Sequence, residues 1–122
     1  MAVVELSKDS FESTVLGEGI VFVDFWATWC GPCRSFAPVF DAAAAANGDI
    51  TFAKVDTEAE AELAQAAGIM SIPTLMAFRD GVLLYREAGA LPAAALDDLI
   101  RQINDLDMDT VEAEIAARGQ EG

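Results

Sequence analysis

One segment, IVFVDFWA at residues 20–27, constrains the fold of this chain more than any other. It is almost continuously apolar, it is rich in β-branched and aromatic side chains, and Asp24 is its only charged residue. A strand with this pattern is buried on both faces, which requires helices on both sides of its sheet. The segment therefore predicts an α/β fold.

The segments around this strand supply the other elements of such a fold. Further strands are expected at residues 3–6 and 50–56 and in a hairpin at 74–88, whose turn is Asp80-Gly81. Capping-box spacing places helix starts at Asp9–Glu12 and at Thr57–Glu60. The order of elements predicts a three-layer α/β/α sandwich around a mixed sheet, with helices at 8–16, 34–48 and 57–68 and a last main helix from Pro92.

Length and charge limit the classes of function. A chain of 122 residues is long enough for one domain with a real core. Its 21 acidic and 7 basic residues give a net charge of −14, which argues against a nucleic-acid partner because few groups would neutralise phosphates. No apolar run is long enough to span a bilayer, and the N-terminus has no signal-peptide pattern. We therefore expect a cytoplasmic monomer without a membrane partner.

Both cysteines of the chain, Cys30 and Cys33, lie in the segment FWATWCGPC. A closed zinc site needs four ligands, and with no histidine and no second cysteine pair it would require a second chain. A purely structural bridge would close too small a loop to remove much entropy from the unfolded chain. Thiol–disulfide electron transfer is the third possibility and the favoured one.

The position of Cys30, between a buried strand and a helix, supports electron transfer. Free amide groups and the helix dipole stabilise a thiolate there, and a thiolate is the form that attacks a disulfide. Gly31 leaves the approach to the sulfur open, and Pro32 suits the first helical turn. Cys33, one turn along, can reach back to Cys30 and is expected to be less accessible to solvent. This asymmetry predicts an attacking and a resolving cysteine.

The segments VDFWATWCGPC, SIPT and AGAL together resemble the thioredoxin family, and the resemblance covers about residues 2–106. It implies the thioredoxin fold with five strands and a redox-active Cys30–Cys33 disulfide with no other cofactor. It also implies reduction of client-protein disulfides through a mixed disulfide. The implied partners are these clients and a flavoprotein thioredoxin reductase that draws on NADPH.

Three further residues acquire roles from the resemblance. The apolar surroundings of Asp24 favour burial over an exposed position, and burial would raise the pKa of its carboxyl group. The family aspartate at this position assists deprotonation of the resolving cysteine. Lys54 matches a family lysine near that aspartate, although alone it is equally compatible with an ordinary surface lysine. Most X–Pro bonds are trans, but the family proline matched by Pro73 is cis and lies against the cysteines.

The resemblance also implies an apolar docking surface for clients. It gathers residues that would each otherwise be interpreted as core or turn: Trp29, Pro32, Ile72, Gly89 and Ala90. Trp26 is expected to pack beneath the site rather than to contact a client.

Residues 107–122 lie beyond the end of the resemblance. We therefore divide the chain into a thioredoxin-like domain, residues 1–106, and an acidic C-terminal extension, residues 107–122. The extension is expected to be a short helix packed on the domain, ending near Gly119, or a frayed tail; a partner-binding helix is the alternative.

Two other functions are weighed against the reductase. A binding subunit, chaperone or redox-gated scaffold would not need the CGPC chemistry, and oxidases and isomerases of this kind usually have other residues between the cysteines.

Overall fold

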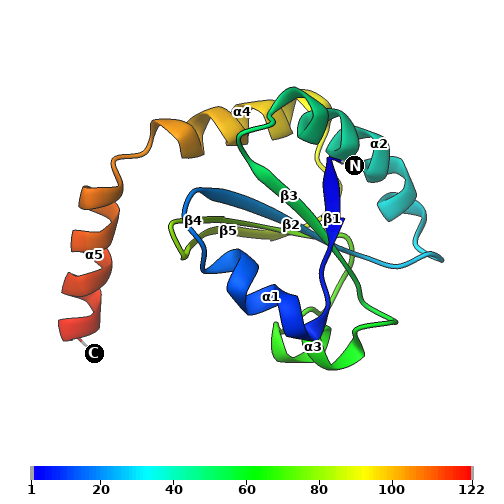
Figure 1. Ribbon diagram of the computed structural model, residues 1–122, viewed down its shortest axis with the longest axis horizontal. Coiled ribbons are helices and arrows are strands. Elements are labelled where there is room, and N and C mark those ends of the chain that lie inside the picture. Colours follow the sequence, from blue (N-terminus) through cyan, green and yellow to red (C-terminus); the bar gives the residue numbers. More distant parts are fainter. Residues whose placement is uncertain (1, 122) are drawn as a thin grey trace.

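A computed structural model describes residues 2–121, which form a five-stranded mixed sheet flanked by helices (Figure 1). The strand order is β1-β3-β2-β4-β5. β3 is parallel to both β1 and β2, whereas β4 is antiparallel to both β2 and β5. The predicted mixed sheet is confirmed, with strands β1 (Val3–Glu5), β2 (Ile20–Trp26), β3 (Thr51–Asp56), β4 (Thr74–Arg79) and β5 (Val82–Ala88).

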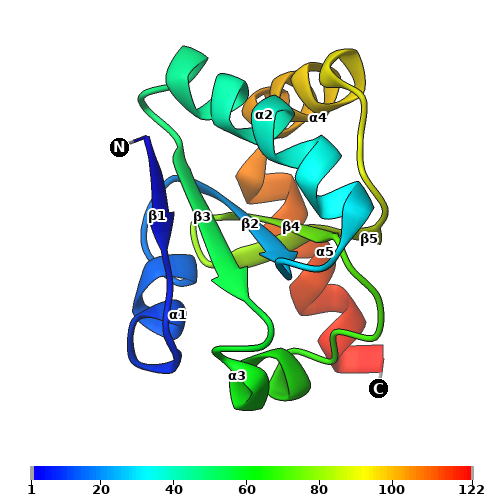
Figure 2. The ribbon, with the colours of Figure 1, turned by 90° about the vertical axis from the view of Figure 1, so that its right-hand side faces the viewer.

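Helices cover both faces of the sheet, as the apolar pattern of β2 requires (Figures 1 and 2). One face carries α1 (Lys8–Val15) and α3 (Ala61–Ala66), and the other carries α2 (Gly31–Ala46) and α4 (Ala93–Asp105). Each face has its own apolar core. The predicted three-layer α/β/α sandwich is confirmed.

β2 belongs to both cores because successive side chains of a strand point to opposite faces. Phe22 packs with α2 and α4, where its ring stacks on Phe52 at a centroid distance of 5.4 Å. Val23 and Phe25 pack on the opposite face with α1 and α3. Two-sided packing fixes the position of this strand, and therefore of the loop that leaves its end.

The first helix begins at Lys8, as predicted, but its capping residues differ from those predicted. α1 is capped by Ser7, whose amide donates to Ser10 Oγ at 2.9 Å, and not by the pair Asp9 and Glu12. The serine pair lies two residues earlier and offers the same reciprocal spacing, so the helix begins there.

α3 begins at Ala61 and not within Thr57–Glu60. The carboxylate of Asp56 accepts hydrogen bonds from the amides of Glu58 and Ala59, at 2.9 and 3.3 Å. These bonds hold a turn immediately after β3 and delay the helix. The predicted helix end at Gly68 (φ 70°) and the turn at Asp80-Gly81 (φ 52° and 81°) are confirmed.

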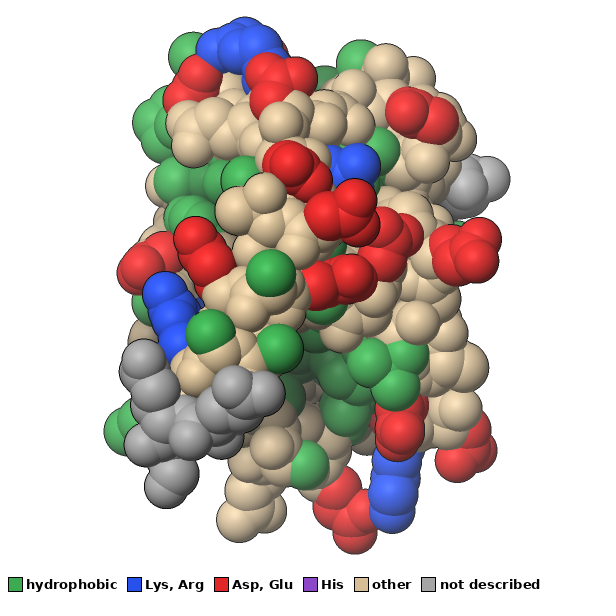
Figure 3. All heavy atoms as spheres, turned by 90° about the vertical axis from the view of Figure 1, so that its left-hand side faces the viewer, with side chains coloured by type: hydrophobic (Ala, Val, Ile, Leu, Met, Phe, Trp, Pro, Cys, Tyr) green, Lys and Arg blue, Asp and Glu red, His purple; other side chains and the backbone are tan. Residues whose placement is uncertain are grey.

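The C-terminal extension forms α5 (Met108–Glu121). It continues through Gly119, so the predicted end at that residue is wrong; a helix tolerates glycine at a modest cost. α5 projects from the body (Figure 1), and between Met108 and Arg118 only Met108 and Val111 are partly buried. The expected packing on the domain is therefore not observed. Figure 3 shows the face toward α5, where acidic side chains are widespread and basic ones are few.

The part of the chain that the structure describes contains no helix long and apolar enough to cross a membrane.

Candidate redox active site

The junction between β2 and α2 places both sulfurs at a helix N-terminus. Cys30 is the N-cap of the 16-residue helix α2, with φ −87° and ψ 112°, and its Sγ accepts a hydrogen bond from the amide of Cys33 at 3.2 Å. Gly31 and Pro32 form the first turn, where proline removes no helical hydrogen bond. The sulfur therefore occupies the position that an aspartate or serine oxygen takes in an ordinary cap.

Cys30 and Cys33 form a disulfide with a Cα–Cα distance of 5.2 Å. Their residue exposures are 4% and 3%, so the predicted difference in accessibility between the two cysteines is not observed. The close packing of Ala27, Trp26 and Ile72 around the sulfurs covers both of them. What distinguishes Cys30 is instead the amide hydrogen bond to its sulfur. Within residues 2–121 no group of three or more histidine, cysteine, aspartate or glutamate side chains is arranged to hold a metal.

A proline loop lies against the disulfide from the other side. The Ile72–Pro73 peptide bond is cis, which confirms the sequence prediction, and Pro73 is fully buried. The carbonyl oxygen of Ile72 lies 3.7 Å from Cys30 Sγ. The amide of Gly89 donates to the carbonyl of Pro73 at 2.8 Å, which joins this loop to the end of β5.

Asp24 is buried in β2, with only 1% of its surface exposed, which confirms the predicted burial. Neither carboxylate oxygen has a hydrogen-bond partner among the described residues, and so neither bonds Lys54 or a cysteine. Desolvation raises the pKa of Asp24 from 3.8 to about 7, an effect that the positive charge of Lys54 reduces and the negative charge of Asp41 reinforces. The carboxyl group is therefore poised to exchange a proton near neutral pH.

Lys54 lies directly beside Asp24 in the parallel register of β2 and β3. Its Nζ lies over the ring of Trp26, 5.4 Å from the centroid, rather than in an ion pair with the aspartate. Trp26 is partly buried and packs against the cysteine cluster, as predicted. Lys54 thus affects Asp24 through space while its ammonium group stacks on the indole.

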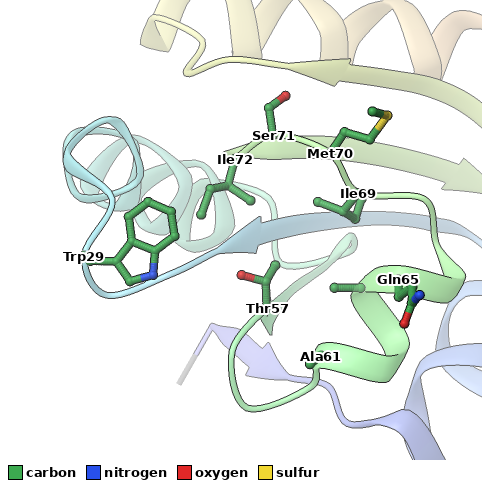
Figure 4. A pocket seen from close by; sticks show the side chains of 9 residues that line it. Trp29, Thr57, Ala61, Gln65, Ile69, Met70, Ser71 and Ile72 are labelled. Carbon is green, nitrogen blue, oxygen red and sulfur yellow. The ribbon is translucent and has the colours of Figure 1, made fainter.

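A groove of about 480 Å³ lies between Trp29, in the loop that leads to Cys30, and the segment of α3 and the loop after it (Figure 4); neither cysteine lines it. Trp29, 67% exposed, forms one end of it, and Met70, 97% exposed, lies toward the other. No charged side chain lines this groove, although the chain as a whole is strongly acidic. Its lining residues are Trp29, Thr57, Ala61, Ala64, Gln65, Ile69, Met70, Ser71 and Ile72.

Only part of the predicted docking surface belongs to this groove. Trp29 and Ile72 line it, whereas Pro32, Gly89 and Ala90 are exposed but do not.

Sequence reasoning missed the wall contributed by α3 and the loop that follows it. The available signal was Met70, an apolar side chain in the loop segment directly before SIPT.

These features together define a class of protein. A buried disulfide caps a helix after a central strand, a cis-proline loop faces it, and a carboxyl group with a pKa near 7 is buried in the same strand. No other element of the described chain offers comparable chemistry. The class is that of the small thiol–disulfide oxidoreductases.

Comparisons with known proteins specify the family. The model of the Thioredoxin family matches residues 2–102. The chain is 56% identical over 113 residues to "Putative thioredoxin 2" of Streptomyces coelicolor, covering 93% of this chain and 84% of that protein. It is 45% identical over 108 residues to the thioredoxin of Mycolicibacterium smegmatis, covering 85% of this chain and 94% of the other.

The structural comparison agrees. The crystal structure of a thioredoxin from Malassezia sympodialis has a TM-score of 0.73 and 36% sequence identity, and the match covers 82% of this chain and 89% of that one. The chain therefore belongs to the thioredoxin family. Its activity is that of a thioredoxin-type protein-disulfide reductase with a CxxC active site.

Proposed function

We propose that Cys30 is the attacking thiolate of this reductase. The amide of Cys33 donates to Cys30 Sγ in the disulfide form, and after reduction the same amide and the N-terminus of α2 stabilise a negative charge on this sulfur. This thiolate attacks one sulfur of a client disulfide, a new Cys30–client bond forms, and the second client sulfur leaves as a thiolate that takes a proton from water. The observation that carries the proposal is the amide hydrogen bond to Cys30 Sγ.

Cys33 completes the reaction with the help of Asp24. The ionised carboxylate of Asp24 accepts the proton of the Cys33 thiol, and a pKa of about 7 leaves part of it ionised at neutral pH. The Cys33 thiolate then attacks Cys30 Sγ, which forms the internal disulfide and releases the remaining client sulfur as a thiolate. This thiolate takes a proton from water, and Asp24 returns its proton to the solvent. Two electrons have moved from the protein dithiol to the client disulfide.

Lys54 is a positioning residue in this proposal. Its charge lowers the pKa of Asp24 against the effect of burial, and so keeps the carboxylate available as a proton acceptor near neutral pH.

The docking surface consists of the groove beside Trp29 together with Pro32, Ile72, Pro73, Gly89 and Ala90. An extended client segment lies against Ile72, whose carbonyl oxygen is 3.7 Å from Cys30 Sγ, so that a client sulfur next to it meets the thiolate. The exposed indole of Trp29 offers apolar contact area for the side chains on either side of that sulfur.

The clients are disulfide-containing proteins in the cytoplasm, and the protein acts as a monomer. A flavoprotein thioredoxin reductase supplies the electrons from NADPH and returns the Cys30–Cys33 disulfide to the dithiol. Membership of the thioredoxin family supports both partners. Residues 1–106 form the catalytic domain, and 107–122 are an extension to it.

The test is reduction of insulin disulfides at neutral pH with dithiothreitol as electron donor. The wild-type protein is expected to accelerate precipitation of the insulin B chain, and Cys30→Ser to reduce the rate to that of dithiothreitol alone. Acceleration that survives in Cys30→Ser would overturn the assignment of the nucleophile. Replacement of dithiothreitol by a bacterial thioredoxin reductase and NADPH then tests the proposed donor.

A further inference from the structure

β5 and the residue directly after it hold both ends of the loop that forms one wall of the groove. At the start of the loop, Arg86 Nη1 donates to the carbonyl of Ala67 and Nη2 donates to the carbonyl of Gly68, each at 2.7 Å. At its end, the amide of Gly89 donates to the carbonyl of Pro73 at 2.8 Å. The loop between Gly68 and Pro73 is thus held at one end by a side chain of β5 and at the other by the amide of the residue after β5.

The first of these points matters because it adds side-chain hydrogen bonds to the end of a short helix, α3, which is otherwise closed by backbone bonds from the amides of residues 67–69. α3 has only six residues, and a helix of this length has little intrinsic stability in water. The guanidinium fork of Arg86 donates two charged hydrogen bonds to the carbonyls of Ala67 and Gly68, the two residues that follow this helix. It lies so close that a Cβ on Gly68 would be 3.2 Å from Nη2.

The loop held in this way carries the side chains that face Trp29. Ile69, Met70 and Ile72 line the groove, and the carbonyl of Ile72 lies beside Cys30 Sγ (Figure 4). The direction in which the chain leaves α3 therefore sets the distance between this wall and Trp29.

We propose that Arg86 is a positioning residue for client docking, acting through the loop from Gly68 to Pro73. It contacts neither sulfur and takes no part in electron transfer. It keeps the groove at the width and orientation that an extended polypeptide requires, so that a client binds without first ordering the loop. The inference rests on the groove being the docking surface of the proposed reductase.

The position of Arg86 on the surface separates this role from a role in global stability. Arg86 is exposed, so water can replace its hydrogen bonds to the two carbonyls when the side chain is removed. The sheet and both cores do not depend on it. Docking does, because a freed loop must be ordered again each time a protein client binds.

The experiment compares wild type, Arg86→Ala and Arg86→Lys, with Arg101→Ala as matched control. Arg101 is also an exposed arginine, and it pairs with Asp98 within α4. The insulin concentration is varied in the dithiothreitol-driven assay to give KM and kcat. In parallel, each pre-reduced protein reacts with a small aromatic disulfide, which needs no extended docking. Thermal melts followed by circular dichroism report folding.

For Arg86→Ala we expect KM for insulin to rise about fivefold while kcat and the rate with the small disulfide stay within twofold. Arg86→Lys keeps one donor group and should recover part of the loss, and Arg101→Ala should match wild type. An unchanged KM, or an equal loss with both substrates, would overturn the role of Arg86. A wild-type protein that does not accelerate insulin reduction would instead overturn the proposed function, independently of Arg86.

Discussion

Two helix N-termini in this molecule use the same capping device in opposite surroundings. α2 begins at Cys30, whose sulfur accepts an amide hydrogen bond at 3.2 Å in a buried cluster. α5 follows Asp107, whose Oδ1 accepts from the amides of Asp109 and Thr110 at 3.1 and 3.4 Å on the exposed surface. The Asp107 side chain is exposed to solvent, whereas the Cys30 sulfur is buried and carries charge only when reduced. Chemistry at a helix N-terminus therefore depends on what is packed around it.

Removal of the resolving sulfur should have the largest effect on activity, so it tests the contrast between the two helix starts most directly. Cys33→Ser leaves Cys30 able to attack a client but unable to be released, so turnover with insulin should fall at least about 100-fold, equivalent to roughly 2.7 kcal/mol. When pre-reduced Cys33→Ser is mixed with insulin in the absence of dithiothreitol, a mixed disulfide with the client should accumulate and appear on a non-reducing gel as a band that dithiothreitol removes. Asp107→Ala, at the other helix start, should turn over as wild type. Absence of the trapped species would assign the attack to Cys33.

The next largest difference is expected between the contributions of a buried side chain of α2 and an exposed side chain of α5 to the free energy of unfolding. Phe40, fully buried in α2, packs edge-on against Phe52 at 5.3 Å, so Phe40→Ala should lower the free energy of unfolding by about 3–5 kcal/mol. Ile115→Ala in α5, where the side chain is 47% exposed, should change it by about 0.5 kcal/mol or less. Urea titration of both variants measures the difference. Similar losses would mean that α5 is packed in solution.

Asp24→Asn should stabilise the protein and slow its release of clients. Because the pKa of Asp24 rises from 3.8 to about 7 on folding, the native state binds more protons between these values. Wild-type stability from this group therefore falls as the pH rises from about 4 to 7 and is constant above that. At pH 8 the variant should be more stable by roughly 4 kcal/mol, and at pH 4 by almost nothing.

Denaturant midpoints across this pH range give the stabilities. Although the variant should be more stable than wild type, its insulin turnover should be slower near neutral pH, because Cys33 lacks its proton acceptor. A pH-independent stability difference between wild type and Asp24→Asn would contradict the raised pKa.

Deletion of residues 107–122 should have the smallest effect. The α5 side chains described are mostly exposed, and the carbonyl of Leu106, which accepts from Arg79 Nη1 at 3.1 Å, is retained. We expect the melting temperature to change by about 2 °C or less and insulin turnover by less than twofold. A large loss of melting temperature or of insulin turnover would instead show that α5 contributes to the domain.

Much of this molecule could be predicted because its sequence signals are local. The almost continuously apolar run of β2 required a covered central strand, and Asp80-Gly81 determined the hairpin turn. The burial of Asp24 followed from apolar neighbours on both sides. Each of these signals is contained within a few consecutive residues.

What could not be predicted depends on competition or on distant contacts. The predicted start of α3 was wrong because Asp56 competes with the predicted capping box. Its carboxylate accepts from the amides of Glu58 and Ala59, and its carbonyl accepts from the amide of Glu60, which the box would have paired with Thr57. The wall of the groove, with Gln65 and Met70, depends on how α3 lies against the β2–α2 loop. The equal burial of the two cysteines arises from side chains of several elements and has no local signal.

The sulfur cap of α2 also has a consequence for the electron affinity of the protein. Folding and oxidation form a thermodynamic cycle. The dithiol and disulfide forms therefore differ in unfolding free energy by an amount that corresponds to the change in reduction potential on folding. Each 1.4 kcal/mol in that difference corresponds to about 30 mV for two electrons. Because the amide of Cys33 contacts Cys30 Sγ, the first turn of α2 contributes both to the stability of the fold and to the reduction potential of the disulfide. A substitution that loosens this turn would therefore change how strongly the protein holds electrons, without touching either sulfur.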